Sequence, residues 1–271
     1  MQKIFQRYRY SRILLKQLVV TDFKLRYQGS VLGYAWSLLR PLALFVILYL
    51  VFGKVFRVGD AVSHFPVYLL VGIVFWNYFA EVTSGSVTSI VGKGDLLRKI
   101  NFPKYVVVLA GSFSALINLF LNGVIIGLFL FINKVDIGAS IVYLPLLVLE
   151  LFIFSLAVAF FLSAIYVKFR DINYIWEVII QAAFYATPIL YPLKYVIDHA
   201  SLNVAKIMML NPMAQIIQDI RYVLVTKDTQ TISDVFGSGL YRLVPVSIIL
   251  LVVILSVAYF KKNSRFFAEE V

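Results

Sequence analysis

The chain contains apolar stretches that are too long and too free of charge to be buried in a soluble core. Residues 105–133, between Lys104 and Lys134, include no charged side chain, and neither do residues 243–260. A helix needs about 20 mostly apolar residues to cross a bilayer, so each stretch can form one spanning helix. Of the 271 residues, 61% are hydrophobic and 14% are charged, whereas about 25% are charged in a typical soluble domain. The sequence therefore predicts an all-α integral membrane protein.

Charged residues and prolines divide the chain, which we interpret as one transmembrane domain over residues 1–271, into six predicted spans. Residues 1–29 mix basic and apolar side chains at helical spacing, which predicts an amphipathic helix in the membrane interface. Residues 192–241 follow Pro188 and Pro192 and are too short to add two spans, so we expect short re-entrant helices there. The spans are expected within residues 30–56, 65–90, 105–133, 138–167, 174–191 and 243–260.

The first span is interrupted by a charge. Arg40 splits the apolar region from Tyr27 to Gly53, and Pro41 follows it. Because proline favours the first turn of a helix, we expect residues 30–39 to form a short interfacial helix and the first crossing to begin at Pro41. One long helix kinked at Pro41 is the alternative.

The distribution of basic residues predicts the orientation. About two thirds of the 25 Lys and Arg residues lie in residues 1–40, the loop at 91–104, the segment between the fourth and fifth spans, and the tail, and such an excess marks the cytoplasmic side. Both termini are therefore expected inside the cell. The net charge of +11 has the same explanation, and no nucleic-acid partner is expected.

Motifs for catalysis and cofactor binding are absent from the sequence. Gly92-Lys93-Gly94 lacks the spacing and the Ser/Thr of a phosphate loop. There is no cysteine, and His64 and His199 are far apart in the chain, so neither a metal site nor a catalytic pair is expected. We expect a transport protein without a cofactor of its own, and not an enzyme.

Several polar residues lie within the predicted spans. Glu81 and Glu150 are ionisable, and such groups are costly in a membrane and usually functional. A proton-coupled carrier would use them as a relay. We expect Asn77, Asn118 and Asn122 to form hydrogen bonds between helices.

The loop at residues 91–104 has the pattern of a short amphipathic helix. Leu96, Leu97 and Ile100 would form an apolar patch surrounded by charged residues. Such a helix inserts into a groove of a soluble partner, or its apolar residues rest among the lipid headgroups. The pattern alone leaves both possibilities open.

Aromatic residues make up 16% of the chain and form runs in the first, second and fifth predicted spans. Aromatic rings stack on the C–H faces of sugars without holding them tightly, so a polymer would slide over such a lining. Ordinary packing between helices is the competing explanation. The candidate channel-lining residues are Phe45, Tyr49, Phe52, Trp76, Tyr78, Phe79, Phe184 and Tyr185.

Segments spread over nearly the whole chain resemble the permease subunits of ABC-2 type transporters, specifically those that export O-antigen, capsule and teichoic-acid polymers. One departure is Arg40, which stands where the family usually has asparagine before the first-span proline. The segments that carry the resemblance are residues 22–41, the loop at 96–103, Phe169-Arg170-Asp171-Ile172, Thr187-Pro188-Ile189-Leu190-Tyr191-Pro192, Asn211-Pro212-Met213 and the tail at 265–271.

The resemblance implies half of an exporter in the bacterial cytoplasmic membrane. Two copies would form a channel for a lipid-linked polysaccharide and would pair with two separate ATPase subunits, which hold ATP and magnesium. The loop at 91–104 would then couple to the ATPase through Lys93, Asp95, Leu96, Leu97, Arg98, Lys99 and Ile100. A gate for the lipid-pyrophosphate end of the polymer would include Lys24, Arg26, Tyr27, Trp36 and Arg40.

Other functions remain as alternatives. A permease for a small drug or a lipid would share the six-span plan without the aromatic lining and the gate. A proton-coupled secondary carrier would depend on Glu81 and Glu150 and need no ATPase. A membrane-embedded transferase would need acidic clusters or histidine motifs in its cytoplasmic loops, and the sequence has none.

Overall fold

The computed structural model describes residues 2–26, 29–99 and 102–267, and this part of the chain consists of helices and connecting loops without a strand. The helices are α1 (Gln2–Arg26), η1 (Gly33–Ala35), α2 (Trp36–Leu48), η2 (Tyr49–Val55), η3 (Val58–Ala61), α3 (Phe65–Val87), η4 (Val91–Lys93), α4 (Gly94–Lys99), α5 (Tyr105–Ile132), η5 (Ala139–Tyr143), α6 (Leu144–Lys168), α7 (Ile172–Ala186), α8 (Leu193–His199), α9 (Leu202–Met209), α10 (Pro212–Leu224), α11 (Ile232–Phe236), η6 (Gly239–Arg242) and α12 (Leu243–Asn263).

Within the described residues, five helical segments are long and apolar enough to cross a membrane. They comprise Gly33–Val55, Phe65–Val87, Tyr105–Ile132, Ala139–Lys168 and Gly239–Asn263, and they coincide with five of the six predicted spans. The remaining predicted span, residues 174–191, corresponds to α7, which has 15 residues and ends at Ala186. Thr187 precedes Pro188 and has the extended backbone that a residue before proline prefers. The count of six spans stays a prediction.

The first span contradicts the predicted boundary at Pro41. After the 3-10 turn η1, α2 runs from Trp36 through Pro41 and continues directly into the π-helical segment η2. The separate interfacial helix predicted at residues 30–39 is therefore wrong, and the alternative of one long helix is closer to the structure.

Helix α3 lies at the centre of the bundle and is packed against α2, α5, α6, α7 and α10. In an apolar stretch of 18 residues within α3, 78% of the residues are buried, compared with 11% in such a stretch of Gly33–Val55 and 22% in one of Gly239–Asn263. Apolar helices with so much exposed surface are stable in lipid, which solvates them. The chain is therefore a multi-pass membrane protein with α3 as its core helix.

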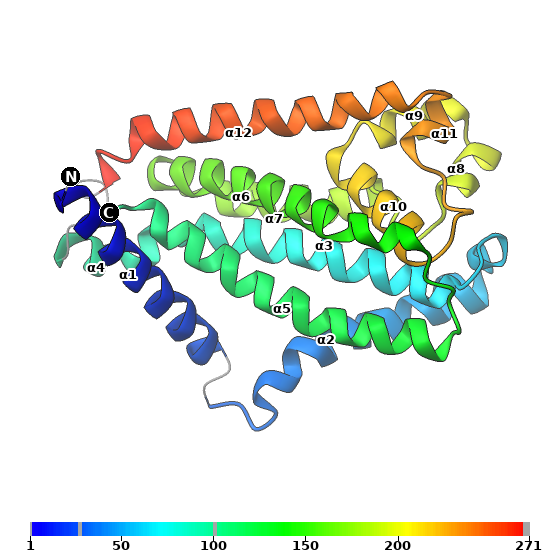
Figure 1. Cartoon of the computed structure of the whole chain (residues 1–271), viewed down its shortest axis with the longest axis horizontal. Helices are drawn as coiled ribbons and strands as arrows, with labels where there is room; N and C mark the ends of the chain where they lie inside the picture. Colours follow the sequence, from blue (N-terminus) through cyan, green and yellow to red (C-terminus); the bar gives the residue numbers. More distant parts are fainter. Residues whose placement is uncertain (1, 27–28, 100–101, 268–271) are drawn as a thin grey trace.

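The two ends of the bundle differ in structure (Figure 1). The beginning of α1, the short helix α4 and the end of α12 gather at one end, on the left of the view, and α8, α9 and α11 gather at the other. Helix α1 packs along α5. At the right-hand end, Leu193, Ala205, Met209 and Ile232 belong to a separate small apolar cluster.

Candidate functional sites for coupling and translocation

The predicted coupling loop forms η4 and α4 at the left-hand end of the bundle (Figure 1). Asp95 and Lys99 are exposed, whereas Leu96 is half-buried and packs against the main core. Ile100 and the side chains of Leu97 and Arg98 lie outside the described residues. Among the described side chains of α4, Asp95 and Lys99 are the ones open to a soluble subunit.

Lys93 joins this loop to α1. Its ammonium group lies 3.0 Å from each carboxylate oxygen of Asp22, and both side chains are about three-quarters buried. The loop pattern that makes Lys93 a predicted coupling residue does not identify this partner. One signal was available, since Asp22 is the single acidic residue among residues 1–40. The ion pair ties the N-terminal helix to the segment that precedes α4.

The described residues of the predicted gate do not form a closed cluster. Lys24 on α1, Trp36 at the start of α2 and Arg40 further along α2 are all exposed. Tyr27 and the side chain of Arg26 lie outside the described residues. The exposed cations are available to a ligand, and their role in a gate stays a prediction.

The backbone hydrogen bond that Pro41 removes from α2 is replaced by one from a side chain of α5. Pro41 has no N–H, so the carbonyl four residues earlier, that of Ser37, loses its helical donor. The Asn122 amide of α5 donates to the Ser37 carbonyl at 3.3 Å and to the Asn118 carbonyl at 2.9 Å. Neighbouring helices commonly satisfy backbone groups that proline frees in a membrane. Asn122 therefore fixes α2 against α5, as the prediction of interhelical hydrogen bonds required.

Asn118 makes the second such bond and donates to the Glu81 carboxylate on α3 at 2.9 Å. Glu150 on α6 has different neighbours. It contacts Gln215 of α10, and Gln215 also donates to Asp219 at 2.7 Å. The two glutamates proposed as a proton relay are thus held by separate partners on separate helices.

Most of the predicted lining aromatics pack between helices of the same chain. Phe79 stacks on Phe154 of α6 at 5.5 Å, and Trp76 meets Phe184 of α7 edge-on at 5.9 Å. Tyr185 is the most open of the set, with 64% of its surface exposed. The buried members are Phe45, Trp76, Tyr78 and Phe79, and the half-buried ones are Tyr49, Phe52 and Phe184.

A buried arginine organises the opposite end of the bundle. Arg221 of α10 is fully buried, and its guanidinium donates to the carbonyls of Pro188 at 2.6 Å and Ile189 at 2.7 Å. It also donates to the Tyr68 carbonyl at 2.9 Å and lies 3.7 Å from the centre of that ring. Arg221 thus holds the broken segment after α7 against α3. No pattern in the sequence singles out Arg221, which lies in the predicted re-entrant region at residues 192–241.

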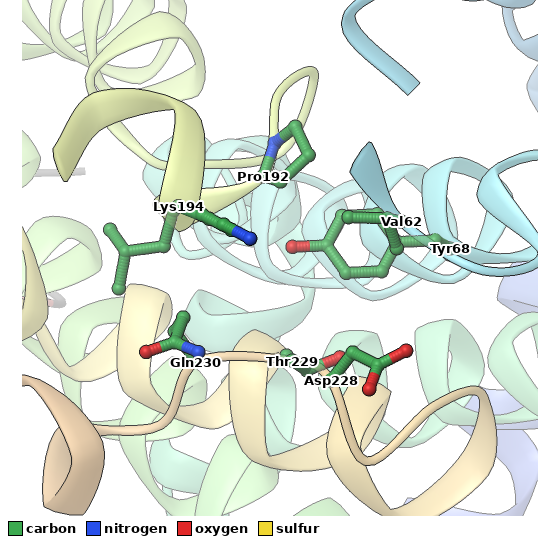
Figure 2. Close-up of a pocket in the computed structure, with 8 residues that line it drawn as sticks. Val62, Tyr68, Pro192, Lys194, Asp228, Thr229 and Gln230 are labelled. Carbon is green, nitrogen blue, oxygen red and sulfur yellow. The ribbon is translucent and has the colours of Figure 1, made fainter. Parts of the chain in front are cut away.

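A small polar pocket of about 230 Å³ lies beside this clamp. Figure 2 shows Tyr68 and Lys194 pointing into it from opposite sides, with Asp228, Thr229 and Gln230 along one wall. Its volume is below the roughly 300 Å³ at which ligand pockets begin. Among the described residues, no group of three or more His, Cys, Asp or Glu side chains could hold a metal ion.

The chain is similar in sequence to a known protein family and to several known proteins. Residues 13–225 match the family model described as ABC-2 type transporter. The chain is 32% identical over 209 residues to the O-antigen export system permease protein RfbA of Myxococcus xanthus, covering 76% of this chain and 77% of that protein. It is 30% identical over 259 residues to a protein of the same name from Klebsiella pneumoniae, covering 94% of each. A second Klebsiella pneumoniae protein of that name is 29% identical over 179 residues, covering 66% of this chain and 68% of that protein.

Proposed function

The chain belongs to the ABC-2 type transporter family, and from this membership we propose that it is the permease half of an ATP-driven exporter of a lipid-linked polysaccharide. The observation that carries the proposal is the similarity to an O-antigen export permease over 94% of both chains. A membrane-spanning bundle without motifs for catalysis agrees with a transport role. The exporter would act in the bacterial cytoplasmic membrane.

In the proposed arrangement, α7 and the segment after it complete a sixth crossing, and both termini face the cytoplasm. At about 1.5 Å per residue, α7 alone is shorter than the roughly 30 Å hydrocarbon core. The Thr187–Pro192 segment would supply the missing length, and the hydrogen bonds from Arg221 satisfy its carbonyls at Pro188 and Ile189. Helices α8 to α11 would then form the external re-entrant region.

We place ATP and Mg²⁺ in a separate nucleotide-binding subunit, because this chain has no phosphate loop. Two copies of that subunit would pair with two copies of this chain. The exposed Asp95 and Lys99 on α4 would meet the ATPase. Through the ion pair between Lys93 and Asp22, movement of the loop would also move α1.

The exposed surface of α7 supports the homodimer. None of its side chains is fully buried, and Tyr174 and Tyr185 expose 70% and 64% of their surfaces. A second copy would cover this surface and leave aromatic rings beside the path of the polymer. Lys24, Arg26 and Arg40 would pair with the pyrophosphate that links lipid to sugar, because cations form strong hydrogen bonds with phosphate.

The test is purification of the tagged chain from its native membrane, followed by identification of the proteins bound to it. We expect a stoichiometric subunit with a phosphate-loop sequence, which is lost when the charges on α4 are reversed in Asp95→Lys/Lys99→Glu. The matched control is Lys194→Glu/Asp198→Lys on α8, which reverses an exposed pair of the same types and spacing at the other end of the bundle. A homo-oligomer with no nucleotide-binding partner would refute the proposal and favour the proton-coupled carrier.

A further inference from the structure

A cavity of about 650 Å³ lies at the α4 end of the bundle, outside the sites above. It opens between the segment that begins α5 and the end of α12. The residues that matter for its chemistry are Lys104, Phe160, Val257, Phe260, Lys261 and Arg265.

One part of the cavity is apolar. Phe160 of α6 and Phe260 of α12 meet edge-on with their ring centres 4.9 Å apart. Val257 exposes 50% of its surface one turn before Phe260. The neighbouring residues of α12 are also exposed and apolar, as expected for a helix in contact with lipid. The floor of the cavity is therefore continuous with the lipid-facing surface of the bundle.

The other part of the cavity is cationic. Lys104 directly precedes α5, Lys261 lies in the last turn of α12, and Arg265 lies two residues beyond the end of that helix. Within residues 2–26, 29–99 and 102–267, no carboxylate lies within ion-pair distance of these three side chains. Three cations that line one cavity, with no carboxylate of the described residues at ion-pair distance, favour an anionic occupant.

We propose that this cavity binds one anionic phospholipid, with its phosphate at Lys104, Lys261 and Arg265 and an acyl chain along Phe160 and Val257. Basic pockets between transmembrane helices on the cytoplasmic side are suited to anionic headgroups. A free phosphate would pair with the three cations but would leave the apolar floor of the cavity uncovered. The proposal rests on the orientation given under the proposed function, which places this end of the bundle at the cytoplasmic leaflet.

The position of the cavity gives the lipid a structural role. Lys104 is the last residue of the predicted coupling loop, and only residues 100–103 separate it from the end of α4. A lipid that contacts both Lys104 and Arg265 joins the base of that loop to the end of the last span. The lipid would therefore hold the coupling end of the permease together.

The test uses the purified full-length chain in neutral detergent, without any ATPase, so that failure to find an ATPase does not affect it. Binding of phosphatidylglycerol and of phosphatidylcholine is measured by native mass spectrometry. We expect selective retention of phosphatidylglycerol and, at about 1 kcal/mol for each basic residue, an affinity roughly 100-fold lower in Lys104→Ala/Lys261→Ala/Arg265→Ala. The control Lys16→Ala/Lys168→Ala/Lys262→Ala removes three exposed charges outside the cavity and should bind as the unchanged chain does.

A second variant separates the lipid from other occupants. Val257→Trp fills the apolar floor and keeps every charge, so it should also weaken binding of phosphatidylglycerol. Equal binding of both lipids, equal loss in the control variant, or full competition by inorganic phosphate would overturn the proposal. Lipid binding that appears only after deletion of residues 268–271 would assign the cavity to the tail of the chain and overturn it as well.

Discussion

Replacing Gly72 with alanine should destabilise the protein, although alanine is the better helix former. A Cβ atom at Gly72 in α3 would overlap the guanidinium of Arg221, which is fully buried. Displacing that group breaks its bonds to the carbonyls of Pro188 and Ile189, and each orphaned buried carbonyl costs about 1–3 kcal/mol. The gain in helix propensity is about 1 kcal/mol. The expected net loss in the free energy of unfolding is therefore about 1–5 kcal/mol.

Gly85 provides the matched control, because it lies on the same helix and a Cβ there would meet nothing within 4 Å. Gly85→Ala should stabilise the protein by up to about 1 kcal/mol. Both variants are measured by unfolding in mixed micelles of increasing sodium dodecyl sulfate content, followed by tryptophan fluorescence. Opposite signs are expected for the two substitutions, and equal stability of the two variants would refute the reasoning.

The cause of the loss can be isolated with a double-mutant cycle. If the clash with Arg221 is responsible, Gly72→Ala should cost little in a chain that already carries Arg221→Met. An undiminished cost in the double variant would mean that Gly72 is needed for a different reason, such as the close approach of an added Cβ atom to Ile189.

Three further predictions follow from the described contacts. Reversing either charge of the Asp22–Lys93 pair should lower the free energy of unfolding. Exchanging the two residues, in a chain with both charges reversed, should restore about 1 kcal/mol of that free energy, measured as the coupling energy of a double-mutant cycle. Asn122→Leu should cost about 1–2 kcal/mol because it leaves a carbonyl without its donor, and the cost should shrink in Pro41→Ala, which returns the missing N–H. Burial raises the pKa of Asp219 above its ordinary value, although Gln215 and Arg242 partly offset this rise. The folded chain therefore keeps a proton that the unfolded chain has released, so stability should fall as pH rises from the ordinary carboxyl range through the raised pKa. Asp219→Asn should flatten this fall in a pH series of unfolding midpoints.

The spans were predictable because each is bounded by charges that a bilayer excludes. The stretch between Lys104 and Lys134 became α5 almost residue for residue. Helix α7 ends at Ala186, before the predicted end of the span at residue 191. Pro188 disfavours helical backbone at Thr187, the residue that precedes it. The continuity of α2 through Pro41 was not predictable from local preference, since it depends on an amide supplied by α5.

The sites were less predictable than the spans because they depend on contacts between segments that lie far apart in the sequence. Arg221 is satisfied mainly by backbone carbonyls, and carbonyls leave no pattern in a sequence. The aromatic runs were visible, yet the pattern of Phe79 cannot distinguish a ring that lines a channel from one that stacks on Phe154. Asp22 and Lys93 are far apart in the chain, so their pairing appears only once α1 is placed along α5.

The central position of α3 has a consequence for how sequences of this kind can diverge. A helix enclosed by five others cannot exchange one bulky side chain without a matching adjustment in a neighbour. Substitutions in Val67–Phe79 should therefore be accepted mainly in compensating groups, whereas those on the lipid-facing sides of α2 and α12 can accumulate one at a time. Homologous chains should accordingly accumulate substitutions fastest on the lipid-facing sides of α2 and α12 and slowest in the central helix α3.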